Sequence, residues 1–509
     1  MRKLKFILSL ILIIELVSFY ISVDVIATNN TPPEMPNGEQ SQGGTPPTGN
    51  PPDGNPPTGN PPTGTPPEGN PPGDGQGNNS STSLSYNGAR TITSDANESG
   101  GTYSSTTGGE NALIVNGAIA TISSATFDKT GDSSDENSDF YGTNAGAIAI
   151  DGTLNIDNSK IRTNGLHANA IFAYGNGKVN ISNSTINTSN NNSGGIMVTG
   201  GGTLAATNLN VTTEGNSSAA IRSDRGGGTL TVEGGTYTAN GIGSPAIYST
   251  ANISVKNATL VATQSEGAIV EGKNTIKLEN TNLTDSNTQL NGQSKTYKNI
   301  FLYQSMSGDA DEGTAEFSSK DSTITTNNGD VFFITNTTAN IDLENTKFVT
   351  NSDGVFLRIE ASSWGNSGSN GGNVTLNAKN QTIEGNIVTD DISTLSMNLY
   401  NGSTYTGIIN GDNSAKQISI TLDKNSSMIL NGDTYVYSLE DADESYSNIT
   451  SNGYNLYVNG KVIQTNGTAN TTTEDENESS KSKIALIAGI AIVLIICIIV
   501  AIALAKRKK

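Results

Sequence analysis

The chain has 509 residues, with 57 glycines, 6% aromatic residues, 15% charged residues and a net charge of −20. An ordinary globular enzyme of this length carries more charge and more aromatic residues, and an excess of acid disfavours binding to a phosphate backbone. Glycine without a Gly-X-Y period excludes collagen, and recurrent apolar pairs argue against full disorder. The composition therefore predicts a long, turn-rich, all-β protein with no nucleic-acid partner.

The N-terminus has the pattern of a targeting segment. It begins with the basic stretch MRKLKF, continues in the apolar run FILSLILII, and reaches the small residue Ala27 after VDVIA. Residues 1–27 are therefore predicted to be a secretory signal peptide. An uncleaved N-terminal anchor is the alternative, although Glu15 interrupts the apolar stretch.

Residues 28–82 are rich in proline and glycine. Proline pairs begin at 46, 51, 56, 61, 66 and 71, a period of five. Proline pairs favour the extended polyproline II conformation, whereas the intervening glycines loosen it. We expect a disordered, semi-flexible spacer.

The C-terminal end has the pattern of a membrane anchor. Residues 464–483 are polar and acidic, as in a short stalk, and residues 484–505 contain no charge over a length sufficient to span a bilayer. The basic residues 506–509 follow, and the positive-inside rule places them in the cytoplasm. We expect a single-pass protein of the cell membrane, with one C-terminal transmembrane helix and an extracellular repeat region; a buried core helix is the alternative. The only cysteine, Cys497, lies in this span, so the extracellular part has no disulfide.

Residues 83–463 repeat. An apolar-x-apolar-x-Asn unit or its variant recurs as LNIDN at 154, VNISN at 179, LAATN at 204, LTVEG at 230, ISVKN at 253, IKLEN at 276 and IDLEN at 341. A second apolar position follows each unit, and a short apolar piece such as AIFAY or GIMV precedes it. Each repeat thus contains three short strands separated by Gly, Asn, Ser and Thr, with no credible helix.

Three alternating strands per repeat are typical of a parallel β-helix, in which the inward residues of successive coils stack. The recognisable units predict about twelve three-strand coils at about 4.8 Å each. A β-propeller would need a fourth strand in each repeat, and a sandwich would not keep so regular a register.

The repeats resemble those of bacterial adhesin-like surface proteins with a right-handed parallel β-helix of the pectate-lyase-like type. The stretches NSDFYGTNAGAIAI and SWGNSGSNGGNVTLNA carry this resemblance together with the repeated unit. For a lyase, the resemblance implies a cluster of calcium-binding acids with a basic residue; for a hydrolase, it implies several aspartates near a histidine.

Asparagine recurs at the corner after the second strand. In VNISNSTINTSN, we expect Val179, Ile181 and Ile186 to point into the core, Asn180 to face solvent, and Asn183 to occupy the corner. Stacked amides at this corner can hydrogen-bond from coil to coil and form an inward ladder. The predicted ladder contains Asn158, Asn183, Asn208, Asn257, Asn280, Asn345 and Asn401.

The sequence offers little support for catalysis. The single histidine, His167, lies in GLHANAI, and the adjacent pair Asp390–Asp391 has no accompanying groups nearby in sequence. A catalytic site needs partner groups as well as an acid. We therefore predict no catalytic residues and no required cofactor.

Three loops should project from one edge of the rod. IRSDRGGG, SGDADEG and SSWGNSGSNGG all lie between the first and second strands of their coils. The acidic loop and the tryptophan lie two coils apart, about 10 Å. We expect a ligand-facing edge formed by Arg222, Asp224, Arg225, Asp309, Asp311 and Trp364. Within it, the first loop with Arg222, Asp224 and Arg225 is a hypothetical clamp for an anionic sugar. The alternatives are an internal salt bridge in the first loop and a tryptophan folded over the core.

Two acidic loops contain the oxygen ligands that calcium prefers. Neither has the full spacing of an EF-hand or a calcium β-roll, so solvated loops are the alternative. The candidate ligands are Asp132, Asp135, Glu136, Asp139, Asp309, Asp311 and Glu312.

Together these patterns predict a membrane-anchored surface protein that acts in adhesion or display by binding a polysaccharide or a host surface. A pectate-lyase-like polysaccharide lyase or hydrolase is one alternative. A passive structural spacer is the other.

Overall fold

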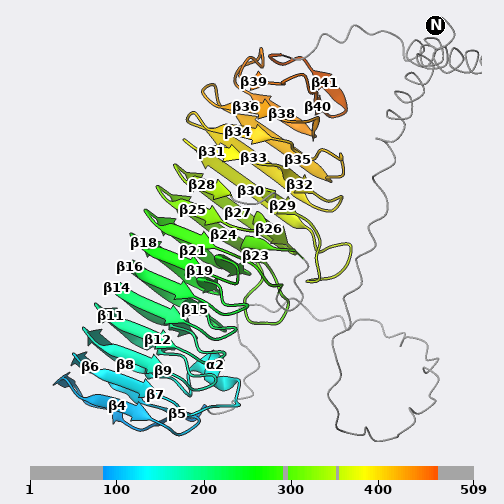
Figure 1. The fold of residues 1–509 in the computed structure, drawn as a ribbon. Coiled ribbons are helices and arrows are strands. Elements are labelled where there is room, and N and C mark those ends of the chain that lie inside the picture. Colours follow the sequence, from blue (N-terminus) through cyan, green and yellow to red (C-terminus); the bar gives the residue numbers. More distant parts are fainter. Residues whose placement is uncertain (1–83, 291–295, 351–354, 468–509) are drawn as a thin grey trace, which may run out of the picture. The chain divides into compact units, whose positions relative to one another are not determined.

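The computed structural model describes residues 84–290, 296–350 and 355–467. They form a parallel β-solenoid of about 15 turns, in which successive coils stack as rungs (Figure 1). The predicted all-β parallel β-helix is confirmed, but the prediction of about twelve coils is too low. The coils that sequence missed have strands such as Ala96–Ser99 and Ser438–Asp441, which lack the apolar-x-apolar-x-Asn unit.

Each typical coil has three strand positions. Some strands are continuous through a corner and occupy two positions: β6 Leu113–Ser123, β8 Ala147–Asp157, β14 Gly202–Thr213 and β16 Gly228–Ala239. The other first-position strands are β2 Thr91–Ile92, β10 Ile171–Tyr174, β13 Ile196–Thr199, β15 Ile221–Ser223, β17 Ile247–Ser249, β20 Ala268–Glu271, β23 Lys298–Tyr303, β26 Asp330–Thr335, β29 Leu357–Ile359, β32 Ile387–Thr389, β37 Thr434–Val436 and β40 Leu456–Val458. The other second-position strands are β3 Ala96–Ser99, β11 Lys178–Ser182, β18 Asn252–Lys256, β21 Thr275–Glu279, β24 Thr314–Lys320, β27 Thr337–Glu344, β30 Gly372–Lys379, β33 Thr394–Tyr400, β35 Gln417–Leu422 and β38 Ser438–Asp441. The other third-position strands are β4 Thr102–Ser105, β7 Thr126–Lys129, β9 Lys160–Thr163, β12 Thr185–Thr188, β19 Thr259–Ala262, β22 Asn282–Asp285, β25 Thr323–Thr326, β28 Lys347–Thr350, β31 Thr382–Glu384, β34 Thr404–Gly407, β36 Ser427–Leu430 and β39 Ile449–Thr450.

The two ends of the solenoid carry further short strands. β1 Asn87–Gly88 pairs with β5 Glu110–Asn111 in parallel. At the other end, β41 Lys461–Ile463 turns back and pairs antiparallel with β40. Among the paired strands of the described residues, this last pair is the one departure from parallel pairing.

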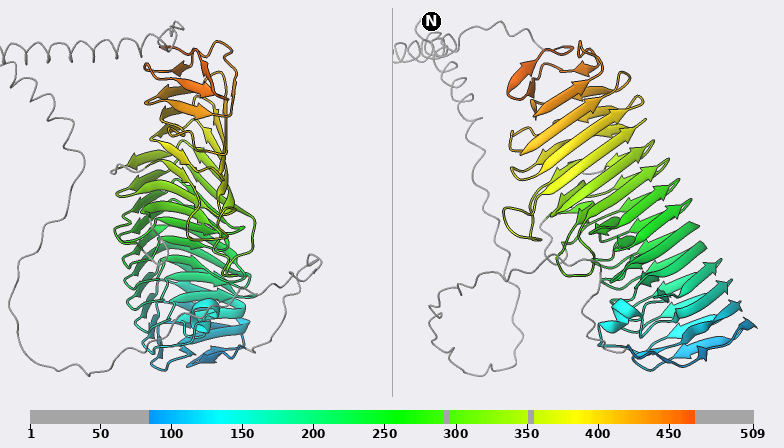
Figure 2. Two further views of the ribbon diagram at one scale, coloured as in Figure 1. Left: turned by 90° about the vertical axis from the view of Figure 1, so that its right-hand side faces the viewer. Right: turned by 180° about the vertical axis from the view of Figure 1, so that it is seen from behind.

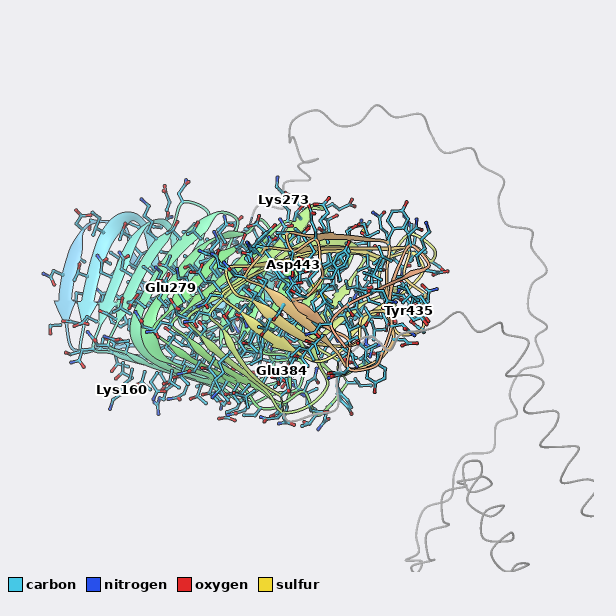
Figure 3. All side chains as sticks on the ribbon, turned by 90° about the horizontal axis from the view of Figure 1, so that it is seen from above. Lys160, Lys273, Glu279, Glu384, Tyr435 and Asp443 are labelled. Atoms are coloured by element: carbon cyan, nitrogen blue, oxygen red, sulfur yellow. The ribbon has the colours of Figure 1, made fainter. Side chains whose placement is uncertain are left out.

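The core follows the alternation expected of β-strands. Val179, Ile181 and Ile186 are all at most 2% exposed, whereas Asn180 is exposed. Val179 pairs in register with Leu154 on one side and with the equivalent leucine of β14 on the other. Outward side chains such as Lys160 and Lys273 extend from the surface of the stack (Figure 3).

The corner asparagines adopt the left-handed backbone conformation. Asn183 has a φ of 48°, and Gly234, the residue at this position in β16, has a φ of 69°. Asparagine and glycine tolerate this region better than other residues do, so the backbone explains their recurrence. The seven asparagines of the predicted ladder share positive φ values: Asn158, Asn183, Asn208, Asn257, Asn280, Asn345 and Asn401.

These asparagine side chains are exposed, so the predicted inward direction of the ladder is wrong, although several of them do hydrogen-bond from coil to coil on the outside. Asn280 Nδ2 donates to Asn257 Oδ1 at 2.6 Å, but Asn183 Nδ2 donates to the carboxylate of Asp157 at 2.8 Å. The inward hydrogen bonds are made by the residue that follows the corner. Ser184 Oγ, for example, accepts from the backbone N–H of Ser159 in the preceding coil at 3.0 Å.

Within the described residues, one short helix interrupts the strands. α2 spans Asn137–Tyr141 and ends at Gly142, whose φ is 72°. The sequence prediction that no repeat contains a helix is therefore wrong at this insertion. The sequence predicts an acidic loop here because five residues are too few for a helical period to show.

Several predicted segments lie outside the described residues: 1–27, 28–82, most of 464–483, 484–505 and 506–509. Within residues 84–290, 296–350 and 355–467, no helix has the length and apolar character needed to cross a membrane. The predicted membrane helix at 484–505 stays a prediction.

The outer face of the first-position strands is covered instead of solvated. Its side chains form a column in register: Ile114, Ile148, Phe172, Met197, Arg222, Tyr248, Ile269, Phe301 and Phe333. A first outer cluster contains Ile114, Ala145, Ile148, Phe172 and Met197, and a second contains Phe301, Tyr303 and Phe333. The loops of the middle coils extend from this edge (Figure 2).

Candidate functional site

A pocket lies between the two outer clusters, where Arg222 and Tyr248 interrupt the apolar column. Its volume is about 340 Å³. The lining residues come from six separate segments of chain: Phe140, Ser217, Ala219, Arg222, Asp224, Gly243, Pro245, Tyr248, Glu266, Ile269, Phe301, Tyr303, Asp309 and Trp364. A break in the column of apolar side chains therefore leaves a hollow with both aromatic and charged walls.

Arg222 is held between two carboxylates on one wall. Its Nη2 donates to Asp224 Oδ2 at 3.0 Å, and its Nη1 lies 3.8 Å from Asp139 Oδ1. The Arg222 side chain is 13% exposed and the Asp224 side chain 4% exposed. Burial raises the pKa of Asp224, although the neighbouring guanidinium opposes the rise.

Arg225 fastens two loops from distant coils. Its Nε donates to Asp309 Oδ1 at 2.7 Å, across three coils of the stack. The guanidinium also lies over the ring of Phe140 in α2, 3.7 Å from the centroid, in a cation–π contact. The helix and the acidic loop thus meet through this one side chain.

Aromatic rings form the opposite wall. Trp364 packs against Phe301 and Tyr303, with ring centroids 5.3 Å apart in each case. The hydroxyl of Tyr303 donates to Glu271 Oε2 at 2.9 Å, and Tyr248 donates to the same carboxylate. Glu271 is 1% exposed, so this buried acid holds the rings of Tyr248 and Tyr303 in place through their hydroxyl groups.

Lys298 lies under the aromatic wall. It is 1% exposed, and its Nζ lies 3.2 Å from Glu266 Oε1 and 4.5 Å from the Phe301 centroid. Burial lowers the pKa of Lys298, whereas the Glu266 carboxylate opposes the change. Glu266, which lines the pocket, is therefore already paired with the ammonium group of Lys298.

Most residues predicted for the ligand-facing edge meet at this pocket. Arg222, Asp224, Asp309 and Trp364 line it, and Arg225 contacts Asp309. Asp311 is exposed and does not line the cavity. The indole of Trp364 is folded onto other rings, as one alternative held, yet it still forms part of the wall.

Four of the acids proposed as calcium ligands, Asp132, Asp135, Asp139 and Asp309, have separate hydrogen-bonding partners. Asp132 accepts from the backbone of Leu166, Asp135 from the backbone and side chain of Asn137, and Asp139 contacts His167. The remaining candidates are Glu136, which precedes α2, the pocket residue Asp309, and the exposed Asp311 and Glu312. Among the described residues, no group of three or more His, Cys, Asp or Glu side chains is arranged to hold a metal ion.

Of the residues considered for catalysis, His167 and Asp390 make local contacts. His167 Nδ1 lies 2.7 Å from Asp139 Oδ2, and the φ of His167 is 55°, as at a left-handed corner. Asp390 accepts from the backbone N–H groups of Ala361 and Ile392. Asp391 is exposed.

Sequence reasoning missed Phe140, Tyr248, Glu266, Phe301 and Tyr303. One signal was available, because strands such as AIFAY and GIMV are apolar at consecutive positions. A strand of that composition is buried on both faces, so its outer face must be covered. The residues that cover it come from loops of irregular length, which the repeat does not predict.

The fold and the pocket define the class of this molecule as a parallel β-helix protein with a loop-covered outer site. Comparison of the chain with family models, with curated proteins and with solved structures finds no match. The adhesin-like and pectate-lyase-like resemblance therefore stays a hypothesis, and the function must be argued from the pocket.

Proposed function

We propose that the chain is a cell-surface protein, anchored by residues 484–505, whose β-helix binds a neutral glycan in the pocket without cleaving it. The observation that carries this proposal is the pairing of an aromatic wall with a wall of carboxylates and a guanidinium around one cavity of about 340 Å³. Aromatic rings can pack against the apolar face of a sugar, while carboxylates accept and guanidinium groups donate hydrogen bonds to hydroxyls. The volume is near the lower end for small-molecule sites and suits the end of a glycan.

The charges favour a neutral ligand over an anionic one. Each cation at the pocket lies beside a carboxylate: Arg222 beside Asp224, Arg225 beside Asp309, and Lys298 beside Glu266. A uronate carboxylate would compete with these internal partners and would approach an acidic lining. This balance makes an anionic-sugar clamp the weaker hypothesis.

The test compares glycan-array binding by the full-length chain with that of Trp364→Ala and Trp364→Phe. We expect the alanine variant to lose affinity on the order of tenfold, because it removes one aromatic face, and the phenylalanine variant to retain part of the signal. Tyr437→Ala is the matched control, since Tyr437 is 58% exposed and lies away from the pocket residues in a late coil. Equal binding by all four proteins would refute the proposal.

A hydrolase is the second candidate, because Asp224, Glu266 and Asp309 line the same cavity and burial raises the pKa of Asp224, as a general acid requires. It is tested by incubating the chain with each glycan that binds and measuring new reducing ends. Release of reducing ends that Asp224→Asn abolishes would replace binding with hydrolysis as the function. Binding without release supports the proposal above.

A further inference from the structure

A buried carboxylate interrupts another column of side chains, inside the solenoid. The inward residues at the end of the third-position strands lie in register, and from β9 to β25 most of them are small: Thr163, Thr188, Thr213, Ala239, Ala262, Asp285 and Thr326. In the coil before them, the buried Lys129 holds the same position. Asp285 is the one acid in that series and is fully buried. Burying an ionised carboxylate without a partner is very costly, so its presence needs an explanation.

Five buried oxygen atoms at this corner have no hydrogen-bond partner among the described residues. They are both carboxylate oxygens of Asp285, the amide oxygens of Asn287 and Asn299, and the hydroxyl of Thr326. Asn287 follows Asp285 by two residues, and Thr326 is the register partner of Asp285 in the next coil.

Gly267 places Asn299 at the same corner. Asp285 Oδ2 lies 2.5 Å from the position that a Cβ on Gly267 would occupy, so the carboxylate fills the space left by this glycine. The backbone N–H of Gly267 donates to the backbone oxygen of Asn299 at 2.8 Å. Asp285 thus faces the strand pair to which Asn299 belongs.

The two amides are oriented by their amino groups. Asn299 Nδ2 donates to the backbone oxygens of Asn328 and Asp330, at 2.7 Å and 2.9 Å. Asn287 Nδ2 donates to the backbone oxygen of Lys298 at 2.9 Å. Because the amino group of each amide already donates a hydrogen bond, the amide oxygens are the atoms that can still bind a partner.

We propose that this corner binds a hard metal cation through Asp285, Asn287, Asn299 and Thr326. Protonation of Asp285 would supply one donor for five oxygen atoms, whereas a cation such as Ca²⁺ takes six to eight oxygen ligands of these kinds. The nearby ammonium of Lys298 lies beside Glu266, 3.2 Å away, which offsets its charge. The site is separate from the pocket and from the acidic loops considered for calcium.

The test uses the full-length chain, treated with a chelator and then dialysed, with calorimetric titration of CaCl₂ and thermal unfolding at neutral pH. We expect one Ca²⁺ site and a higher melting temperature in its presence, because a ligand of the folded state stabilises it. Asp285→Thr introduces the residue that Thr188 and Thr326 provide at this position in other coils, and it should abolish both the binding of Ca²⁺ and the rise in melting temperature. Asn287→Ala should weaken binding on the order of tenfold. Asp311→Asn is the matched control, because Asp311 is an exposed acid outside the pocket, and it should behave as the wild type in both assays.

Parallel titrations with MgCl₂ and NaCl identify the cation, and a response to either in place of Ca²⁺ supports the site. The proposal is overturned if the wild type responds to no cation, or if Asp285→Thr responds as the wild type does.

A buried neutral acid would give a different pH profile. Burial raises the pKa of Asp285 well above its ordinary value, so its contribution to stability would be greatest at acid pH and lost as pH rises through the raised pKa.

Discussion

The left-handed corner at Asn183 provides a direct test of why asparagine recurs in this chain. Its φ of 48° costs a residue with an ordinary β-carbon about 1–2 kcal/mol, whereas glycine adopts it without steric cost. The side-chain hydrogen bond from Asn183 to Asp157 is exposed and adds little. We therefore expect Asn183→Leu to lower the local stability of its coil by about 1–2 kcal/mol, and Asn183→Gly to change it by less than about 0.5 kcal/mol.

Native-state hydrogen exchange of the amides in β11 and β12 is the suitable assay, because coils of a solenoid can open without global unfolding. A loss of 1–2 kcal/mol corresponds to exchange that is about 5- to 30-fold faster. Asn187→Leu is the matched control, since Asn187 is exposed in the same coil but lies in the strand β12. Equal losses in Asn183→Gly and Asn183→Leu would refute the backbone explanation and favour the amide hydrogen bonds.

Two other predictions concern charge. Lys129 is fully buried and donates to the backbone oxygens of Thr107 and Gly131, and burial lowers its pKa to about 8. The folded state then holds fewer protons than the unfolded state above about pH 8, so stability followed by chemical denaturation should rise from there to about pH 10, and Lys129→Met should remove that rise. On the surface, Glu344 lies 3.0 Å from Lys320 and 3.3 Å from Lys379. Glu344→Lys should therefore lower the melting temperature in dilute buffer, and about 0.5 M NaCl should recover most of the loss because salt screens exposed charges. A loss that salt does not change would contradict a charge effect.

The strands could be predicted because the inward positions of a coil follow a period of two. Val179 and Ile181 are buried because inward positions alternate along a strand, and the equivalent residues of other coils are buried for the same reason. The pattern therefore recurs in seven repeats and can be recognised in the sequence. The predicted coil count failed at the ends of the solenoid. There, strands such as Ser438–Asp441 pair with only part of the preceding strand and do not need the full apolar unit.

The location of the pocket could be predicted in part. Arg225 and Asp309 lie in loops that follow first-position strands, and a constant order of strands and loops places such loops at one edge. The contact between Arg225 and Asp309 spans three coils, and it depends on the conformation of the loop after β23. That conformation is set by side-chain contacts such as the one between Arg225 and Phe140, for which the repeat contains no signal.

The Asn ladder shows how a correct position can have the wrong physical reason. The sequence predicts the corner position of the asparagines correctly, and some of their amides do bond from coil to coil, but these bonds lie on the outside and not in the core. Gly234 occupies the same position in β16 and has no amide, while its φ is also positive. The shared requirement is therefore the backbone conformation, and the inward hydrogen bonds belong to neighbours such as Ser184.

Both proposed sites lie where a column of side chains changes character. In a solenoid, each coil repeats the backbone of its neighbours, so the backbone alone provides the same surface at every rung. Arg222 and Tyr248 replace apolar residues in the outer column and open the pocket, whereas Asp285 replaces a threonine or alanine in the inner column. Charged groups at these positions reduce the packing of otherwise apolar or small-residue columns, and such a cost is typical of a functional site more than of a structural one. The middle coils, where both breaks occur, are therefore the part of the rod in which ligand contacts should first be sought.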